Sequence, residues 1–319
     1  MTYQELKERQ AWSLEQKIDH SLGTINQFYE RLNGQVYVSF SGGKDSTVLL
    51  WLARKLYPDI KAVYCNTGNE YPDIVKFVRD MKQRGENIEI IYPKLKPREV
   101  LATYGFPLIS KEMSEKIWYA KNRPDSVRAK YALGAKPNAY FKIANRYMYL
   151  LNEPYKVHSL CCQKLKKDPF HRYERENKLY PIMGTMASES KLRESKYLSN
   201  GGCNIFHEKQ GGKSMPLSIW TEQDIWDCIN RYNIPIAEIY RKGAKRTGCM
   251  FCGYGIQFKD DERLKLVHDL YPKWYHTFMN YTNNGVSYRE AARKVLSTNG
   301  LFLPDEAPPT LFDEIDLQD

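Results

Sequence analysis

The stretch Val36-Tyr37-Val38-Ser39-Phe40-Ser41-Gly42-Gly43-Lys44-Asp45-Ser46 decides the fold of this chain. Its first five residues are mostly β-branched or aromatic, which is typical of a short buried parallel strand. The glycine pair lets the backbone turn sharply and approach a ligand closely. From Thr47 to Leu56 the apolar residues are spaced as on one side of a helix. A strand, a glycine turn and a helix in this order predict an anion site, because free backbone amides point at the ligand.

The side chains of this loop suit phosphate groups. Lys44 offers a cation, and Ser41 and Ser46 offer hydroxyl donors. Asp45 cannot attract phosphate, so we expect it to help hold Mg²⁺ or to fix the loop. The pattern is not a Walker A sequence. It resembles the S-G-G-x-D-S loop of PP-loop proteins, which hold the pyrophosphate of ATP or an equivalent phosphate; a glycine turn that arose by chance is the alternative.

Strands and helices alternate on both sides of the loop. We expect strands at Ile60–Tyr64, Ile88–Tyr92 and Tyr180–Met186, and helices at 5–32 and Tyr71–Arg84. Strand–helix–strand units of this length predict a doubly wound parallel sheet covered by helices on both faces. The predicted fold class is therefore α/β and Rossmann-like.

Three regions are predicted along the chain. They are an N-terminal helix (1–35), a nucleotide-binding domain (36–253) and a helical C-terminal extension with an acidic tail (254–319). Residues 104–157, rich in Lys, Arg and Tyr, predict a helical insertion in the middle region. Residues 199–213 carry two glycine pairs and predict a mobile loop or a hairpin. Further helices are expected from Thr221, over Asp261–Asn280 and over Ser287–Leu296, with a loosely ordered tail from Pro304.

Three later segments carry a family resemblance. Residues 63–72 resemble an apolar strand followed by D-T-G, with Asn66 in place of the acid. Residues 184–193 resemble G-x-R-x-x-E-S-x-x-R, with Met186 in place of the first arginine. Residues 216–226 resemble P-L-x-x-W-T-x-x-D-[IV]-W, in which the tryptophans are expected to pack. Together with the loop, these segments make the chain resemble the phosphoadenosine-phosphosulfate (PAPS) reductase family of PP-loop proteins.

The resemblance implies a fold of the adenine nucleotide alpha hydrolase type and a site for ATP or an adenylylated sulfate nucleotide with Mg²⁺. The nucleotide-binding residues that it implies are Ser41, Gly42, Gly43, Lys44, Asp45, Ser46, Asn66, Thr67, Gly68, Glu189, Ser190 and Arg193. Lys44, Asp45 and Arg193 are the catalytic candidates among them. Arg193 suits a phosphate or sulfate, because its planar guanidinium is always charged.

Two cysteine pairs point to metal or redox chemistry. An odd total of seven cysteines, without a secretory leader, argues against a secreted disulfide scaffold. Cys161-Cys162 and the later Cys249-x-x-Cys252 resemble the cluster-binding branch of the sulfonucleotide reductases. The resemblance implies that these four thiolates hold a [4Fe–4S] cluster, with Lys166 offsetting its negative charge. Structural zinc, a redox disulfide and plain buried thiols are the alternatives.

The other three cysteines are interpreted as spare thiols. Cys228 lies in the middle of a predicted helix and is expected in the core, and Cys65 follows a predicted strand. Cys203, between the glycine pairs, is the candidate for a mobile reactive thiol.

The reductases of this family carry a catalytic cysteine in an E-C-G-[IL]-H motif near the C-terminus, and this chain has no cysteine after Cys252. Its last residues offer carboxylates, which cannot replace a sulfur nucleophile. We therefore expect a Mg²⁺-dependent, adenylating ATP pyrophosphatase coupled to iron–sulfur-assisted sulfur transfer onto a nucleic acid or nucleotide. One alternative is an APS or PAPS reductase that uses Cys203 or a partner's thiol. The other is a nucleotide-sensing module with a structural cluster.

Composition adds an expectation about partners. The formal net charge is +10 at a pI near 9.0, and 24 tyrosines accompany the positive charge. Such a balance favours anionic partners, here an adenine nucleotide and a tRNA or DNA substrate, besides a thiol or sulfur-donor protein. Solubility alone is the other explanation. Without a long apolar run or a secretory leader, we expect no membrane span and a cytoplasmic location.

Overall fold

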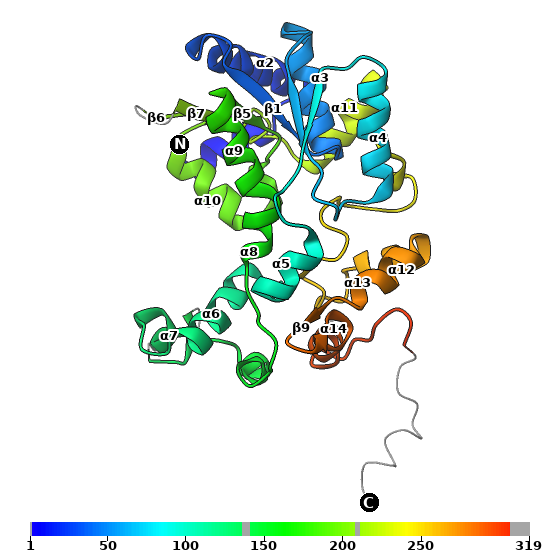
Figure 1. The fold of residues 1–319 in the computed structure, drawn as a ribbon. Helices are drawn as coiled ribbons and strands as arrows, with labels where there is room; N and C mark the ends of the chain where they lie inside the picture. Colours follow the sequence, from blue (N-terminus) through cyan, green and yellow to red (C-terminus); the bar gives the residue numbers. More distant parts are fainter. Residues whose placement is uncertain (1, 136–140, 208–210, 307–319) are drawn as a thin grey trace, which may run out of the picture. The chain divides into compact units, whose positions relative to one another are not determined.

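The computed structural model describes residues 2–135, 141–207 and 211–306, and these form two compact units (Figure 1). The first unit contains the chain up to Asn66, Tyr71–Tyr92 and Pro169–Arg246. The second contains Thr67–Glu70, Pro93–Asp168 and the chain from Thr247 onward. Each unit is thus assembled from segments that are far apart in the sequence. The loosely ordered tail predicted from Pro304 lies for the most part outside the described residues.

A six-stranded sheet in the order β3-β2-β1-β5-β7-β6 forms the centre of the first unit. The strands are β1 (Val36–Phe40), β2 (Ala62–Cys65), β3 (Ile88–Ile91), β5 (Tyr180–Met183), β6 (Asn204–His207) and β7 (Gly211–Ser214). All neighbours are parallel except β6 and β7, which form an antiparallel edge. The predicted parallel sheet is confirmed. The described part of 199–213 contributes to that edge, as the predicted hairpin would.

Helices cover this sheet (Figure 1). They are α1 (Tyr3–Gln10), α2 (Leu14–Arg31), α3 (Lys44–Leu56), α4 (Pro72–Gln83), α9 (Asp168–Asn177), α10 (Lys191–Asn200) and α11 (Glu222–Tyr232), with short turns η4 (Ala187–Glu189) and η5 (Glu238–Tyr240). The single helix predicted for 5–32 is wrong, because the chain forms two. Ser13 begins the second one with a capping box, since its hydroxyl accepts from the Gln16 N–H and the Gln16 side chain accepts from the Ser13 N–H.

Two apolar layers hold the sheet. On one side, Tyr37 and Val63 pack against Tyr173 of α9, with Phe170 beside them. Among the apolar residues of the predicted helix from Thr47 to Leu56, Val48, Leu49 and Leu52 of α3 are fully buried. Burial of each such side chain stabilises the fold by about 1.5–3 kcal/mol.

A buried ion pair fixes the start of α11. The ammonium of Lys17, which is 2% exposed, lies 2.7 Å from the carboxylate of Asp224. The same carboxylate accepts from the N–H of Thr221, the residue that caps α11. The helix expected from Thr221 is confirmed, and Thr221 and Asp224 form a capping box at its start, with the acid of that box paired to Lys17.

The second unit is mainly helical. Its elements are α5 (Pro97–Tyr104), β4 (Leu108–Ile109), α6 (Lys111–Asn122), α7 (Val127–Ala132), η2 (Asn145–Leu151), α8 (Leu160–Cys162), η3 (Gln163–Lys167), β8 (Gly253–Tyr254), α12 (Arg263–Leu270), α13 (Pro272–Met279), β9 (Thr282–Asn283), β10 (Val286–Ser287) and α14 (Tyr288–Ser297). The described part of 104–157 is largely helical, as predicted, but β4 pairs in parallel with β8. The helix predicted over Asp261–Asn280 is divided in two at Tyr271, because Pro272 begins a new helix.

Candidate functional site

The sheet order places the phosphate loop where α/β folds bind ligands. From β1 the chain proceeds to β2 and β3 on one side, and it returns through β5 on the other side. Loops that leave adjacent strands in opposite directions open a crevice at the carboxyl ends of those strands. The two loops here approach closely: a Cβ built on Gly184, after β5, would lie 3.2 Å from the carbonyl oxygen of Asp45. The predicted phosphate loop and the predicted 184–193 segment therefore come together.

Gly42 and Ser46 fix the backbone conformation of the phosphate loop. Gly42 has a φ of +72°, and a Cβ there would lie 2.8 Å from Ile74 and 2.9 Å from Val78 of α4. Both the left-handed backbone and the close packing therefore require glycine. The Ser46 hydroxyl accepts from the Ser41 N–H (3.1 Å) and donates to the Gly43 carbonyl (2.9 Å). Ser46 thus braces the loop from inside, whereas Ser41 is exposed at its surface.

Lys44 is the enclosed cation of the site. Its side chain is 4% exposed, and its ammonium lies 3.1 Å from a carboxylate oxygen of Glu222 and 3.4 Å from one of Asp45. The rings of Trp226 and Tyr240 lie 5.9 and 5.8 Å from it, within cation–π range. Burial alone would lower the pKa of Lys44, but Asp45, Glu222 and Tyr240 raise it above the ordinary value. The lysine therefore stays charged.

Asp45 is an acid in an unfavourable setting. Burial is the main cause that raises its pKa, the Lys44 ammonium counteracts it, and the charges of Glu189 and Glu222 raise it further. Its Oδ1 is buried and makes no hydrogen bond, although it has Lys44 as an ionic neighbour. A buried carboxylate oxygen in this condition suits a further cation or donor.

Glu189 connects the second loop to two arginines. It forms ion pairs with Arg193, four residues further on, and with Arg246 at 3.2 Å. Its other role is local, because it accepts from the Met186 N–H at 3.0 Å. Ser190 caps α10 by accepting from the Arg193 N–H at 3.3 Å. Met186, which replaces the family's arginine, is buried.

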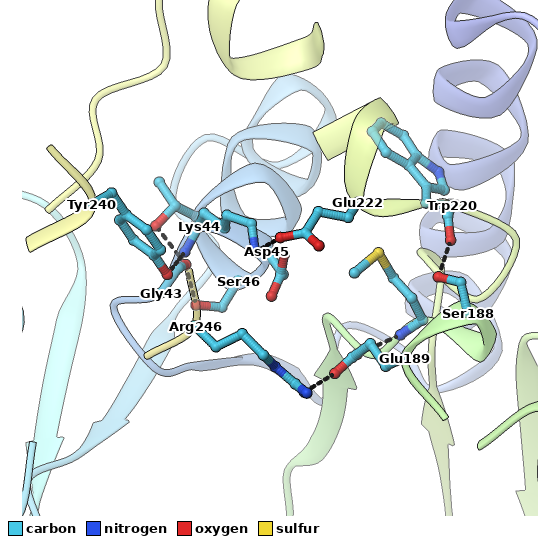
Figure 2. A network of polar contacts seen from close by, with 12 residues as sticks. Gly43, Lys44, Asp45, Ser46, Ser188, Glu189, Trp220, Glu222, Tyr240 and Arg246 are labelled. Carbon is cyan, nitrogen blue, oxygen red and sulfur yellow. Dashed lines mark hydrogen bonds and ion pairs between the residues drawn. The ribbon is translucent and has the colours of Figure 1, made fainter. Parts of the chain in front are cut away.

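Figure 2 shows the side chains of Lys44, Asp45, Glu189, Glu222 and Arg246 around the loop, with Lys44 directed at Glu222 and Arg246 directed at Glu189. The cations are Lys44, Arg193 and Arg246, and the carboxylates are Asp45, Glu189 and Glu222. The three cations and three carboxylates balance one another in charge. A nucleotide phosphate can bind by replacing a carboxylate as the partner of a cation, and Glu222 is the most exposed carboxylate of the set at 59%.

Sequence reasoning missed three residues of this network. Glu222 stands at a variable position of the W-T-x-x-D motif, and Arg246 ends the exposed basic run that begins at Arg241. The hydroxyl of Tyr240 accepts from the Lys44 N–H at 2.8 Å. Of these three residues, only Arg246 lay in a recognisable sequence feature, the basic run. The other two could not be identified, because only the folded chain brings residues 220–246 to the loop.

The segment Asn66–Gly68, which follows β2, is partly buried. Asn66 is half-buried at the end of the sheet, in the first unit. Thr67 belongs to the second unit, is 2% exposed, and donates both its N–H (2.9 Å) and its hydroxyl (2.7 Å) to Glu70. Gly68, with a φ of +78°, forms the turn between them. Nucleotide contacts by these three residues stay a prediction.

The four predicted cysteine ligands all lie in the second unit and form no disulfide. Among the residues that the structure describes, no group of three or more His, Cys, Asp or Glu is arranged so that it could hold a single metal ion. The charges of the other three thiols nevertheless contribute to the raised pKa of Cys161, so the four thiols lie within electrostatic range of that residue. A cluster needs a wider arrangement than one ion, since each thiolate binds a different iron atom. Four free thiols in one unit offer the donor chemistry that an iron–sulfur cluster needs.

Cations accompany these thiols. A hydrogen bond from Cys161, together with Lys111 and Lys166, lowers the pKa of Cys162 to about 5. Burial raises the pKa of Cys249 to about 12 against the pull of Lys166, and burial also raises the pKa of Cys252. Lys166 is thus near the thiols, as the resemblance implied. Most of the group is protonated at neutral pH, so a metal centre would displace protons on binding.

Backbone contacts shape the Cys249–Cys252 turn. The Met250 N–H donates to the Asn69 carbonyl at 2.8 Å, and the Tyr288 hydroxyl donates to the Phe251 carbonyl at 3.0 Å. Gly253 follows at a close approach, because a Cβ there would lie 2.3 Å from the Pro107 carbonyl oxygen. The pairing of β4 with β8 therefore holds the second cysteine pair against the insertion. On the other pair, a π-helical turn, η3, begins directly after Cys162, a distortion that is frequent at functional sites.

The spare thiols are buried. Cys228 is fully enclosed in α11, which confirms the core interpretation, and Cys65 is 4% exposed. Cys203 as a mobile reactive thiol is wrong: it is 7% exposed, and burial raises its pKa to about 11. Its backbone carbonyl accepts from the Met215 N–H at 2.9 Å, which fixes it beside the sheet edge.

Fold and loop together define a class, the α/β proteins that bind nucleotides through a PP-loop at the switch point of a parallel sheet. The phosphoadenosine phosphosulfate reductase domain matches residues 35–114 and 125–254. The chain therefore belongs to the phosphoadenosine phosphosulfate reductase family, as its motifs indicated.

Curated relatives agree with this membership. An uncharacterized protein of Methanocaldococcus jannaschii is 28% identical over 266 residues, which cover 80% of this chain and 51% of the relative. A second uncharacterized protein from the same organism is 25% identical, and the matched region covers 82% of this chain and 45% of that relative. The chain thus spans about half the length of these two relatives. An adenosine 5'-phosphosulfate reductase of Halalkalibacterium halodurans is 22% identical, with 76% of this chain and 84% of the relative covered.

Solved structures give weaker likenesses. A PAPS reductase of Candida auris aligns at a TM-score of 0.43 with 14% identity, covering 78% of this chain and 96% of that one. A U34-tRNA thiolase of Methanococcus maripaludis with a [4Fe–4S] cluster aligns at 0.36 with 14% identity, covering 93% and 84%. At TM-scores below 0.5 neither likeness carries a functional argument.

In the described parts of the chain, no helix is both long and apolar enough to cross a bilayer.

Proposed function

We propose that this protein is an adenylating ATP pyrophosphatase that couples nucleotide activation to sulfur transfer onto a nucleic acid. The observation that carries the proposal is the enclosed Lys44 beside a glycine loop at the switch point of the sheet. That arrangement suits the binding of a polyphosphate. A bound polyphosphate is required both for the activation of an acceptor and for the release of pyrophosphate.

The chemistry balances without an added reductant. An acceptor oxygen attacks the α-phosphorus of ATP, the bond from that phosphorus to the bridging oxygen breaks, and pyrophosphate leaves. A sulfide-level donor then attacks the activated carbon, the carbon–oxygen bond breaks, and AMP leaves with the oxygen. Lys44 and the loop amides would hold the departing pyrophosphate charge, and Arg193 or Arg246 would face the α-phosphate once Glu189 releases it.

Mg²⁺ would enter with the nucleotide in this proposal. Asp45 is the protein ligand that we propose, because its buried Oδ1 lacks a hydrogen bond, and because burial and, to a lesser degree, the charges of Glu189 and Glu222 raise its pKa. Phosphate oxygens and water would complete the shell, as is usual for this ion.

A [4Fe–4S] cluster is proposed on Cys161, Cys162, Cys249 and Cys252, and when bound it would supply a site that accepts and releases sulfur or electrons. The support is the grouping of four free thiols with Lys111 and Lys166. Those two lysines would balance part of the charge of four thiolates.

The nucleic-acid substrate is supported by the surface of α6 and α7. Arg123 lies over the Trp118 ring at 5.7 Å, and Arg128 lies over the Tyr119 ring at 5.0 Å. Arg123, Arg128 and Lys130 are exposed, and none forms an ion pair with a described residue. Guanidinium planes held on aromatic rings suit the backbone and bases of single-stranded nucleic acid.

A sulfonucleotide reductase is the second candidate, because an adenosine 5'-phosphosulfate reductase is among the relatives. With Cys203 buried and its pKa raised, the nucleophile in that case would be a partner's thiol. A thiolate would attack the sulfuryl sulfur of APS or PAPS, forming a thiol S-sulfonate and displacing AMP or adenosine 3',5'-bisphosphate. A second thiol would then attack the thiol sulfur of that adduct, so that a disulfide forms and sulfite leaves.

One experiment separates the candidates. The protein is purified without oxygen and given Mg-ATP with and without mixed tRNA or DNA, and AMP and pyrophosphate are measured. Formation of both in equal amounts, stimulated by nucleic acid, supports adenylation. Intact ATP, with sulfite release from APS or PAPS and a thiol donor, supports reduction; nucleotide binding without either reaction supports a sensing module.

The nucleic-acid surface has its own test. We expect Arg123→Ala with Arg128→Ala to weaken binding of single-stranded RNA or DNA and to lower its salt dependence by about two charges. Arg175→Ala, an exposed arginine of α9, is the control. Equal binding by the double variant and the control would contradict this surface.

A further inference from the structure

One hydrogen bond of the phosphate loop reaches a distant segment of the chain. The hydroxyl of Tyr240, the last residue of η5, accepts from the Lys44 N–H at 2.8 Å, although 196 residues separate the two (Figure 2). Lys44 opens α3, so its N–H has no acceptor within the helix, and the N-cap residue Gly43 has no side chain to supply one. The amides of Ser41 and Gly43 are bonded to hydroxyls of the loop itself. Tyr240 thus takes an amide of the kind that binds phosphate at a helix N-terminus.

Tyr240 also lies against the Lys44 side chain. The centre of its ring is 5.8 Å from the ammonium, and the ring meets that of Trp226 edge-on, with the two centres 5.8 Å apart. Hydroxyl and ring together therefore engage both the amide and the ammonium that Lys44 offers to a phosphate. A phenol oxygen is neutral, whereas hydrogen bonds to an ionised acceptor are about twice as strong as neutral ones. A phosphate oxygen can therefore displace the hydroxyl from the amide.

The backbone around Tyr240 is anchored independently of this contact. Ile239 is fully buried, Ala244 is 6% exposed, and the Ala244 N–H donates to the Ile239 carbonyl at 3.1 Å. The ammonium of Lys242 lies 2.8 Å from the carboxylate of Asp73, in the first turn of α4. The Tyr240 side chain itself is half-buried. Because its neighbours hold the backbone, the hydroxyl can leave the loop by rotation of its own side chain.

We propose that Tyr240 is a reversible cap of the phosphate loop, whose hydroxyl yields the Lys44 amide to a phosphate oxygen when a nucleotide binds. The proposal rests on the proposed function, since it assumes that the loop holds a nucleotide phosphate. The bond to the hydroxyl must break before a ligand can use the amide, which lowers the affinity for every ligand. An oxygen that carries charge offsets this loss, and a neutral oxygen does not. Tyr240 therefore favours charged phosphate groups at this position.

The test measures the binding of inorganic pyrophosphate and of Mg-ATP by calorimetric titration. It compares the unaltered protein with Tyr240→Phe and with the control Tyr232→Phe. Phenylalanine at position 240 keeps a ring beside Lys44 and removes the acceptor. Tyr232 ends α11, is 38% exposed, and packs its ring on Trp51 rather than on a residue of the loop.

For Tyr240→Phe we expect both ligands to bind about two- to tenfold more tightly, because a neutral hydrogen bond no longer has to be broken. Tyr232→Phe is expected to bind both like the unaltered protein. Equal affinities in Tyr240→Phe and the unaltered protein would mean that the hydroxyl serves only the start of α3, and would overturn the proposal. Weaker binding by Tyr240→Phe would also overturn it, because the hydroxyl would then contact the bound phosphate.

If Tyr240→Phe fails to fold, the protein with 3-fluorotyrosine in place of Tyr240 decides, because that residue retains the hydroxyl. Its fluorine NMR signal should move as pyrophosphate saturates the loop, and a signal that stays in place would overturn the proposal. Failure of the unaltered protein to bind either ligand is a different result, which removes the phosphate loop from the proposed function and this inference with it. Binding of ATP without formation of AMP contradicts adenylation alone and leaves this inference in place.

Discussion

Lys44 and its carboxylate partners set the behaviour of the site at the scale of single residues. The ammonium is enclosed by Trp226 and Tyr240 and balanced by Asp45 and Glu222, so it is charged but already engaged. Phosphate binding is then an exchange of partners. The cost of that exchange depends on how well Glu222, exposed at 59%, is solvated once it leaves.

Lys44→Ala should weaken ATP binding by at least about tenfold, because a charge-assisted hydrogen bond contributes about 1.5–3 kcal/mol. Calorimetric titration with ATP measures it. Lys55→Ala is the matched control, since Lys55 lies on the same helix but packs over Trp51 at its far end. Equal affinities for the two variants would refute the phosphate loop.

Glu222→Gln should strengthen ATP binding by a few fold, because the amide competes less well than the carboxylate for Lys44. The same titration, run at low and high salt, should show the largest gain at low salt. A weaker complex would mean instead that Glu222 serves the bound nucleotide, for example through its metal ion.

At the scale of elements, the meeting of the phosphate loop with α4 leaves no room for a side chain. Gly42→Ala should lower the free energy of unfolding by about 1–3 kcal/mol and impair ATP binding. The alanine would have to adopt a left-handed backbone conformation, and its Cβ would lie 2.8 Å from Ile74. Gly23→Ala in α2 meets nothing within 4 Å and should raise stability by about 0.5–1 kcal/mol. Urea denaturation measures both. A Gly42→Ala protein as stable as the Gly23→Ala one would contradict the packing.

Elements were predictable where local chemistry alone defines them. The strand Val36–Phe40, the loop and α3 follow from adjacent residues, and so did the Thr221 cap. Glu222 and Arg246 could not be found, because the crossover of the sheet brings them to the loop from 180 to 200 residues further along the chain. The burial of Cys203 was missed for a related reason, since its glycine neighbours suggested mobility while tertiary packing enclosed it.

At the scale of the whole molecule, the two proposed sites belong to different compact units. The phosphate loop and its partners lie in the first unit, and all four predicted cysteine ligands lie in the second. Nucleotide binding and the proposed cluster can therefore be tested one at a time.

Cys249→Ser should lose the brown colour and most of the iron of an anaerobic preparation while ATP affinity stays within about twofold, because the nucleotide site lies in the other unit. Cys228→Ser, a change in the core of α11, is the control for a lost thiol that is not a ligand. Iron analysis and the ATP titration are the measurements. Full iron content in Cys249→Ser would refute that ligand, and zinc in place of iron would change the metal but keep the ligand.

The interleaving of the two units bears on how the chain is made. The polypeptide passes between them at residues 66/67, 70/71, 92/93, 168/169 and 246/247. On the ribosome, the first unit cannot close until Arg246 has emerged, and the thiols at 161 and 162 wait nearly a hundred residues for their counterparts at 249 and 252. At about 5–20 residues per second that delay lasts on the order of five to twenty seconds. Any site that joins the two cysteine pairs, the proposed cluster included, can therefore form only after Cys252 has left the ribosome.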